Sequence, residues 1–187
     1  MQTEPMTRGG RITRCSGPIS CGLALGVLLL CCLLAASIAA ADGLPQPQGP
    51  AILTVTGSVE RTNSGEGAVF DREMLADLGM ESLETTTAWD EGTVLFEGVL
   101  LRRLLDAVGA KGDTIHATAL NAYHVDIPFD DVKAYDVILA MKMNGAALSL
   151  RDKGPLWIVY PLTDHPELDT PEFNSRWIWQ LQSLEIQ

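Results

Sequence analysis

Residues 94–109 read VLFEGVLLRRLLDAVG, and a helical pattern of apolar residues begins inside this stretch. Apolar side chains recur there at the i, i+1, i+4, i+5 and i+8 positions that place them on one face of a helix. They are Leu100, Leu101, Leu104, Leu105 and Val108. Arg102, Arg103 and Asp106 fall on the opposite face, and Gly109 and Gly112 follow the last apolar residue. The sequence therefore predicts an amphipathic helix with one buried face, ended by the glycines.

After this helix the pattern changes to that of β-strands. Predicted strands cover residues 114–120, 122–127, 137–143, 146–150, 156–160 and 177–186. Asn144-Gly145 separates two of them and is typical of a type I′ hairpin turn, because both residues tolerate positive φ. Residues 128–133 predict a short helical turn with Asp130 near its cap. Strands dominate, helices are few and short, and strand and helix do not alternate regularly, so the predicted class is α+β and mostly β.

Before residue 94 the chain predicts a strand, a turn, a short helix and a second strand. The strand covers residues 53–59, and residues 63–67 form the turn. Asp71 is a suitable N-cap for a helix over residues 72–78, with Gly79 just past its end, and the Thr-rich residues 82–89 follow as a strand. Residues 42–50 are rich in proline and glycine, so we expect an extended linker before a domain at residues 51–187.

The first 41 residues have the three parts of a secretory signal peptide. Arg8, Arg11 and Arg14 precede an apolar run at residues 22–36, and small residues at 35–41 follow it. A membrane anchor is the alternative, but the run is shorter than the ~20 residues that a span requires. We therefore expect a cleaved signal at residues 1–41 and a periplasmic or secreted product.

Cysteine and charge limit what the rest of the chain can do. All four cysteines, Cys15, Cys21, Cys31 and Cys32, lie inside the predicted signal, so residues 42–187 can form no disulfide and offer no thiolate to a metal. These residues carry 10 basic and 23 acidic side chains, a net charge near −13. Such a charge repels nucleic acid, so we expect no nucleic-acid partner.

Five short motifs occur in one order over residues 94–187. They are FEGVLL at 96–101, YHVDIP at 123–128, LAMKMNG at 139–145, GPLWIVYP at 154–161 and RWI at 176–178. Together they resemble the molybdopterin-binding domain of the sulfite oxidase family. The resemblance implies a mostly β domain with few helices, in agreement with the pattern of apolar residues.

Two departures from the family bear on activity. Family enzymes bind molybdenum through one cysteine thiolate, which no residue after Cys32 can supply. Export of a protein already loaded with this cofactor uses a twin-arginine signal, whereas Arg8, Arg11 and Arg14 are not adjacent. We therefore expect a non-catalytic binding or sensory module without a bound cofactor. The alternative is a molybdopterin-dependent oxidoreductase in which an oxygen ligand replaces the thiolate.

The resemblance also implies a candidate ligand pocket with aromatic walls. Its residues would be Trp89, Tyr123, His124, Trp157, Tyr160 and Arg176, together with the loop at residues 162–174. Such a pocket would suit a small anionic or planar ligand, with Arg176 as the anion contact. In the alternative the pocket is filled in, Arg176 pairs with Glu172 or Asp169, and Trp177, Trp179 and Leu181 simply share the core face of the last strand.

Other sites and partners are less defined by the sequence. His116, His124 and His165 are the only histidines and lack metal-ligand spacing, so we expect no metal site. Although His124 is also a candidate pocket residue, we expect His124 and His165 to be surface histidines with satisfied hydrogen bonds. No G-x-S-x-G, phosphate-binding glycine loop or C-x-x-C is present. A membrane sensor or redox subunit is a candidate partner.

Overall fold

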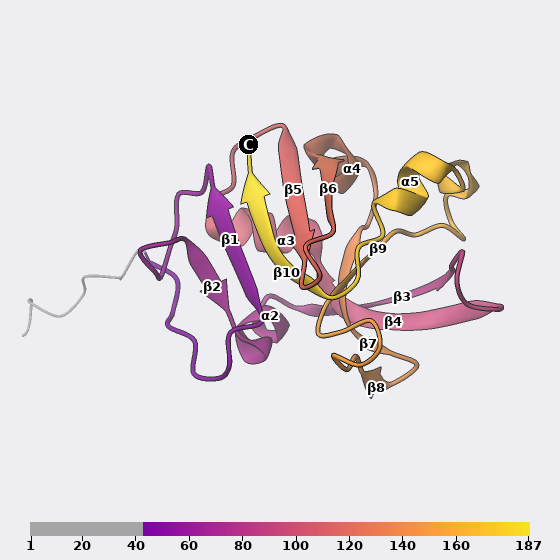
Figure 1. Cartoon of the computed structure of the whole chain (residues 1–187), viewed down its shortest axis with the longest axis horizontal. Coiled ribbons are helices and arrows are strands. Elements are labelled where there is room, and N and C mark those ends of the chain that lie inside the picture. Colours follow the sequence, from indigo (N-terminus) through magenta and orange to yellow (C-terminus); the bar gives the residue numbers. More distant parts are fainter. Residues whose placement is uncertain (1–42) are drawn as a thin grey trace, which may run out of the picture. The chain divides into compact units, whose positions relative to one another are not determined.

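The structure is a computed structural model that describes residues 43–187, so the predicted signal peptide at residues 1–41 lies outside the described residues. Two five-stranded sheets make up most of this part of the chain (Figure 1). Four short α-helices and one 3-10 turn accompany them in residues 43–187. The predicted α+β, mostly β class is confirmed.

The first sheet joins segments from the two ends of the described chain. Its central strand is β10 (Leu181–Ile186), which lies between β1 (Leu53–Gly57) and β5 (Thr114–Ala119) (Figure 1). β1 and β10 run parallel, and the other neighbours are antiparallel. The two edges are β2 (Ala68–Phe70) and β6 (His124–Pro128). The last strand therefore completes the sheet that β1 begins.

The second sheet is built on a long antiparallel hairpin. β3 (Met80–Thr86) pairs along its whole length with β4 (Thr93–Leu100). β4 also pairs with β7 (Ile138–Met143), and β7 pairs in turn with β8 (Ala146–Ala147) and β9 (Trp157–Val159).

A glycine is required where β4 meets β7. The register shifts between Glu97 and Gly98, and a Cβ at Gly98 would lie 2.1 Å from the carbonyl oxygen of Leu139. Such a separation is far below van der Waals contact, so the glycine of the FEGVLL motif lets the two backbones pack closely.

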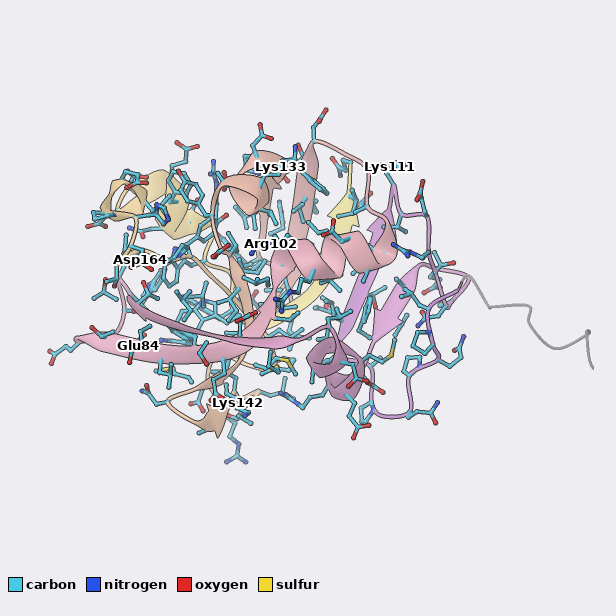
Figure 2. The ribbon with its side chains drawn as sticks, turned by 180° about the vertical axis from the view of Figure 1, so that it is seen from behind. Glu84, Arg102, Lys111, Lys133, Lys142 and Asp164 are labelled. Carbon is cyan, nitrogen blue, oxygen red and sulfur yellow. The ribbon has the colours of Figure 1, made fainter. Side chains whose placement is uncertain are left out.

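The amphipathic helix predicted after β4 is present as α3 (Leu101–Val108). Its side chains at Leu101, Leu104, Leu105 and Val108 are buried, and the helix ends at Gly109. Arg102 lies on the exposed side of α3 (Figure 2, in which the molecule is viewed from the side opposite to Figure 1). The predicted apolar face therefore packs on the core.

The other helices are short. Asp71 caps the N-terminus of α2 (Arg72–Asp77), and its carboxylate accepts a hydrogen bond from Met74 N at 2.9 Å. The predicted helical turn is present as α4 (Phe129–Ala134). The sequence analysis missed the 3-10 turn Pro166–Leu168 and α5 (Pro171–Ser175), which occupy the expected loop. In residues 43–187, no helix is long and apolar enough to cross a membrane.

The core is continuous between the two sheets. Phe96 of β4 and Trp157 of β9 pack edge to face with ring centroids 5.1 Å apart, and both are fully buried. Leu53 and Ile115 of the first sheet belong to the same buried cluster. The aromatic residues of the second sheet therefore stabilise both layers.

The expected linker is part of the domain, which corrects the prediction for residues 42–50 over the described residues 43–50. The backbone N–H groups of Gln48 and Gly49 donate to Asp71 Oδ2 at 2.7 and 2.8 Å, and Leu44 packs against the core. These bonds join residues more than twenty positions apart, so local composition gave no sign of them. The hydrogen bond from the Met74 N–H lowers the pKa of Asp71 the most, and the bonds from Gly49 and Gln48 lower it further.

The last predicted strand is shorter than expected. Gln180 has a φ of 53°, outside the β region, so β10 begins only at Leu181. Ile178 N donates locally to Arg176 O at 3.0 Å instead of joining the ladder of β10. The expectation that Trp177, Trp179 and Leu181 share one strand face is therefore wrong.

Gly145 provides a test of the β7–β8 turn. Asn144 and Gly145 have φ values of 49° and 79°, as a type I′ turn requires. Because a β-branched residue resists positive φ, we expect Gly145→Val to reduce the free energy of unfolding by ~1 kcal/mol or more. Urea denaturation measures this.

Gly65→Val is the matched control for this substitution. Gly65 also lies in a turn with open space around it, but it is not held at positive φ. An equal loss of stability in the two variants would contradict the assigned turn.

Candidate aromatic binding site

All four tryptophans of the chain form one cluster, here called the tryptophan cluster. Trp89 lies on the β3–β4 loop, Trp157 on β9, and Trp177 and Trp179 between α5 and β10. The Trp89 ring centroid is 5.7 Å from that of Trp177, 5.4 Å from that of Trp179 and 6.2 Å from that of Trp157. Three segments distant in sequence thus converge on one aromatic surface.

A cavity of about 350 Å³ opens beside this cluster. Its lining residues are Trp89, Ala119, Asn121, Tyr123, Asn174, Ser175, Trp177, Ile178 and Trp179. We call it the aromatic cavity. Its size is at the lower end of the ~300–1,000 Å³ range of small-molecule sites. No lysine, arginine, histidine or carboxylate is among its lining residues.

Two exposed aromatic residues border the aromatic cavity. Trp89 is 42% exposed and Tyr123 is 47% exposed. The Tyr123 hydroxyl donates to the carbonyl oxygen of Ser175 at 3.0 Å, which connects the β5–β6 turn to α5. Large aromatic residues that remain exposed beside a cavity offer apolar surface to a ligand.

One polar group of the cavity lining lacks a partner. Asn174 Oδ1 is buried and makes no hydrogen bond within the protein. A buried acceptor without a donor costs ~1–3 kcal/mol of desolvation. A ligand with an N–H or O–H group could offset that cost.

An ion pair holds the loop that carries Trp89. Lys153 Nζ donates to Asp90 Oδ2 at 2.7 Å, and Thr87 Oγ1 donates to the same oxygen at 2.9 Å. Burial raises the pKa of Asp90, but the hydrogen bonds from Lys153 and Thr87 outweigh it, and the net shift is downward. Asp90 therefore stays ionised at neutral pH. Lys153 Nζ also lies 4.3 Å from the Trp157 ring centroid, a cation–π contact within the tryptophan cluster.

Arg176 belongs to a buried hydrogen-bonded group, here called the Arg176 network. Its Nη1 donates to Asp131 Oδ2 at 2.7 Å and its Nη2 donates to Glu172 Oε1 at 2.5 Å. The Tyr160 hydroxyl donates to Asp131 Oδ2 at 2.9 Å. Burial, and then the negative charge of Asp131, raise the pKa of Tyr160, so its hydroxyl stays protonated. The network joins α4, the segment after β9 and the end of α5.

The predicted site residues separate into two groups. Trp89 and Tyr123 line the aromatic cavity. Trp157 and Tyr160 are fully buried and Arg176 is 8% exposed, and the three do not line it. Arg176 contacts Glu172, as the alternative expected, but its buried partner is Asp131. The expectation that Arg176 faces the pocket is wrong, because two carboxylates hold its guanidinium.

His124 also lies away from the cavity lining. Its ring centroid is 5.1 Å from that of His116 on the neighbouring strand, and His116 Nδ1 is 2.7 Å from Asp126 Oδ1. Among residues 43–187 there is no group of three or more His, Cys, Asp or Glu side chains that could hold a metal ion. His124 is a surface residue of the first sheet.

Sequence reasoning missed Asp131 and placed Asn174 only as the last residue of the expected loop at residues 162–174. Asp131 is adjacent to the predicted cap Asp130, but its partner Arg176 is 45 positions away. Asn174 follows a Thr-Pro pair at residues 170–171, and that pair is a helix-start signal that could have revealed α5. Neither residue carries a local motif that marks a pocket.

Comparison with known proteins agrees with this fold. The family described as the oxidoreductase molybdopterin binding domain matches residues 71–163, from the cap of α2 past the end of β9. The fold and the match define a molybdopterin-binding domain of the oxidoreductase class. Residues 71–163 form a domain of this family, and the described residues have the sulfite-oxidase-type fold.

A solved structure has a similar fold. The sulfane dehydrogenase SoxCD from Paracoccus pantotrophus matches with a TM-score of 0.52 and 23% sequence identity. The alignment covers 72% of this chain and 37% of that one, so the present chain spans well under half of its length. At this identity the likeness concerns the fold alone. No curated protein sequence matches the chain.

The residues present do not fit a metal-bearing molybdopterin in the aromatic cavity. The aromatic walls could accept a pterin ring, but no cationic side chain lines the cavity to meet the phosphate of this cofactor. Residues 43–187 contain no cysteine, so the soft thiolate ligand of the metal is missing. The donor set therefore differs from the one that the family name implies.

The Arg176 network makes a clear prediction for stability. Arg176→Ala leaves Asp131 buried without its counter-charge, so we expect the free energy of unfolding to fall by about 3 kcal/mol or more. Urea denaturation monitored by tryptophan fluorescence measures this.

Glu172→Ala is the control for this experiment. It removes the exposed partner of the same guanidinium, so the expected loss is below about 1 kcal/mol. Equal losses in the two variants would contradict the buried role of Asp131.

Proposed function

We propose that this protein is an exported, non-catalytic binding module on a molybdopterin-binding fold. The observation that carries the proposal is the combination of an aromatic cavity with a chain that offers no thiolate after Cys32. The cavity provides a surface for a small molecule. The absence of a cysteine removes the thiolate with which family enzymes bind molybdenum. The protein would therefore bind a small molecule without using a metal.

The polarity of the site supports a neutral or cationic ligand over the expected anionic one. Arg176, the candidate anion contact, is neutralised by Asp131 and Glu172. The aromatic lining contributes apolar area, and the amides of Asn121 and Asn174 contribute polar groups. A small planar or compact ligand therefore suits the cavity better than a phosphate or carboxylate.

The export part of the proposal rests on the sequence. Arg8, Arg11 and Arg14, the apolar run at residues 22–36 and the small residues that follow are typical of a cleaved signal peptide. The arginines are not adjacent, so the chain would cross the membrane unfolded and without a preloaded cofactor. A periplasmic or secreted location follows, with a membrane sensor or redox subunit as candidate partner.

The alternative function is a molybdopterin-dependent oxidoreductase with an oxygen ligand to the metal. Membership of the molybdopterin-binding family is the observation that favours it. An oxygen donor is harder than a thiolate and would alter the redox behaviour of the metal.

Metal and pterin analysis of protein isolated from its exported fraction separates the two functions. We expect less than ~0.1 molybdenum per chain and no pterin fluorescence after denaturation, because the thiolate is missing. A molybdoenzyme prepared in parallel from the same cells shows that the cofactor is available. Stoichiometric molybdenum, or a released pterin, would contradict the non-catalytic proposal.

A further inference from the structure

We propose that the aromatic cavity binds a small organic cation that carries an N–H group, such as an alkylammonium ion. The inference rests on the proposed binding function and names the ligand class of that site. Three independent features of the cavity support it: its aromatic walls, the charges around it and its unpaired acceptor.

The walls have the composition of a cation-binding aromatic cage. Trp89, Trp177, Trp179 and Tyr123 all line the cavity, and of these Trp177 is almost fully buried. The planes of Trp89 and Trp179 are inclined at 86° to each other, so they present π faces in different directions. An organic cation is attracted to such faces, with Trp the strongest of the aromatic residues.

The charges near the cavity leave an excess of negative charge. Asp131 and Glu172 both pair with the guanidinium of Arg176. In the sequence Arg176 lies between Ser175 and Trp177, which line the cavity. Asp90, next to Trp89, is balanced by Lys153. The described domain is strongly acidic as a whole. Such a field attracts cations and repels phosphate and carboxylate ligands.

The unpaired acceptor distinguishes among cations. Asn174 lines the cavity, and its Oδ1 is buried without a donor. A protonated amine can donate an N–H to this oxygen once the Asn174 amide turns toward the cavity, whereas a quaternary ammonium has none to donate. A charge-assisted bond of this kind is stronger than a neutral one. The site should therefore prefer tertiary or less substituted ammonium ions to quaternary ones.

The cluster already accepts one cation within the protein. Lys153 Nζ lies over the Trp157 ring, which is itself 6.2 Å from Trp177 and from Trp179. This contact is on a buried tryptophan that does not line the cavity, so it leaves the exposed surfaces of Trp89 and Trp179 to a ligand.

Calorimetric titration of the chain from residue 42 onward, at pH 7 and low salt, tests the proposal. The probes are trimethylammonium, tetramethylammonium, the neutral isostere tert-butanol, and inorganic phosphate. We expect trimethylammonium to bind about 5-fold more tightly than tetramethylammonium, from one charge-assisted hydrogen bond. We expect weaker binding of tert-butanol and none of phosphate. No binding of trimethylammonium, or binding of tert-butanol or phosphate at equal strength, would overturn the proposal.

Two variants locate the binding in the cavity. Trp89→Ala should weaken trimethylammonium binding by about 5-fold or more, because it removes an exposed wall of the cage. Asn174→Leu should abolish the preference for trimethylammonium over tetramethylammonium. Leu150→Ala, an exposed apolar residue outside the cavity lining, is the control and should change neither value. If Trp89→Ala does not fold, the half-exposed Tyr123→Leu replaces it.

The outcome is separable from that of the proposed function. Stoichiometric molybdenum in the isolated protein would overturn both proposals. A molybdenum-free protein that ignores trimethylammonium, or whose Trp89→Ala variant binds it unchanged, would overturn only the cation site.

Discussion

The buried ion pair between Arg176 and Asp131 constrains the rest of the structure most strongly. Each charge is nearly removed from water, so neither can remain there without the other. The pair joins α4 to the end of α5, and Tyr160 of the segment after β9 donates to the same carboxylate oxygen. Because Ser175 and Trp177 flank Arg176 in sequence, fixing the arginine also fixes two residues that line the aromatic cavity.

The same pair determines the polarity of the candidate site. A free arginine at this position would have made the cavity suitable for anions. With its guanidinium held by Asp131 and Glu172, the cavity instead keeps aromatic walls, neutral amides and a negative surrounding. The family scaffold is thus preserved in its fold while the donors around the cavity differ from those of a molybdenum site. Binding without metal chemistry is the function that we propose for these residues.

The sequence predicted the parts of the fold that depend on local pattern. The apolar face of α3, the capping of α2 by Asp71 and the Asn144-Gly145 turn all follow from side chains a few positions apart. The packing of residues 43–50 on Asp71 and the pairing of Arg176 with Asp131 join distant segments, so no local pattern marks them. In the site, the family resemblance identified Trp89 and Tyr123, whereas the burial of Trp157 and Tyr160 depended on tertiary packing.

A double-mutant cycle on Arg176 and Asp131 tests most directly whether this pair is structural. The variants are Arg176→Met, Asp131→Leu and both together, each studied by urea denaturation. The account predicts that the double variant loses at least ~1 kcal/mol less stability than the sum of the single variants, because each single variant strands a buried charge and the double variant strands none. Additive losses would show that the two residues do not interact and would contradict a structural role for the pair.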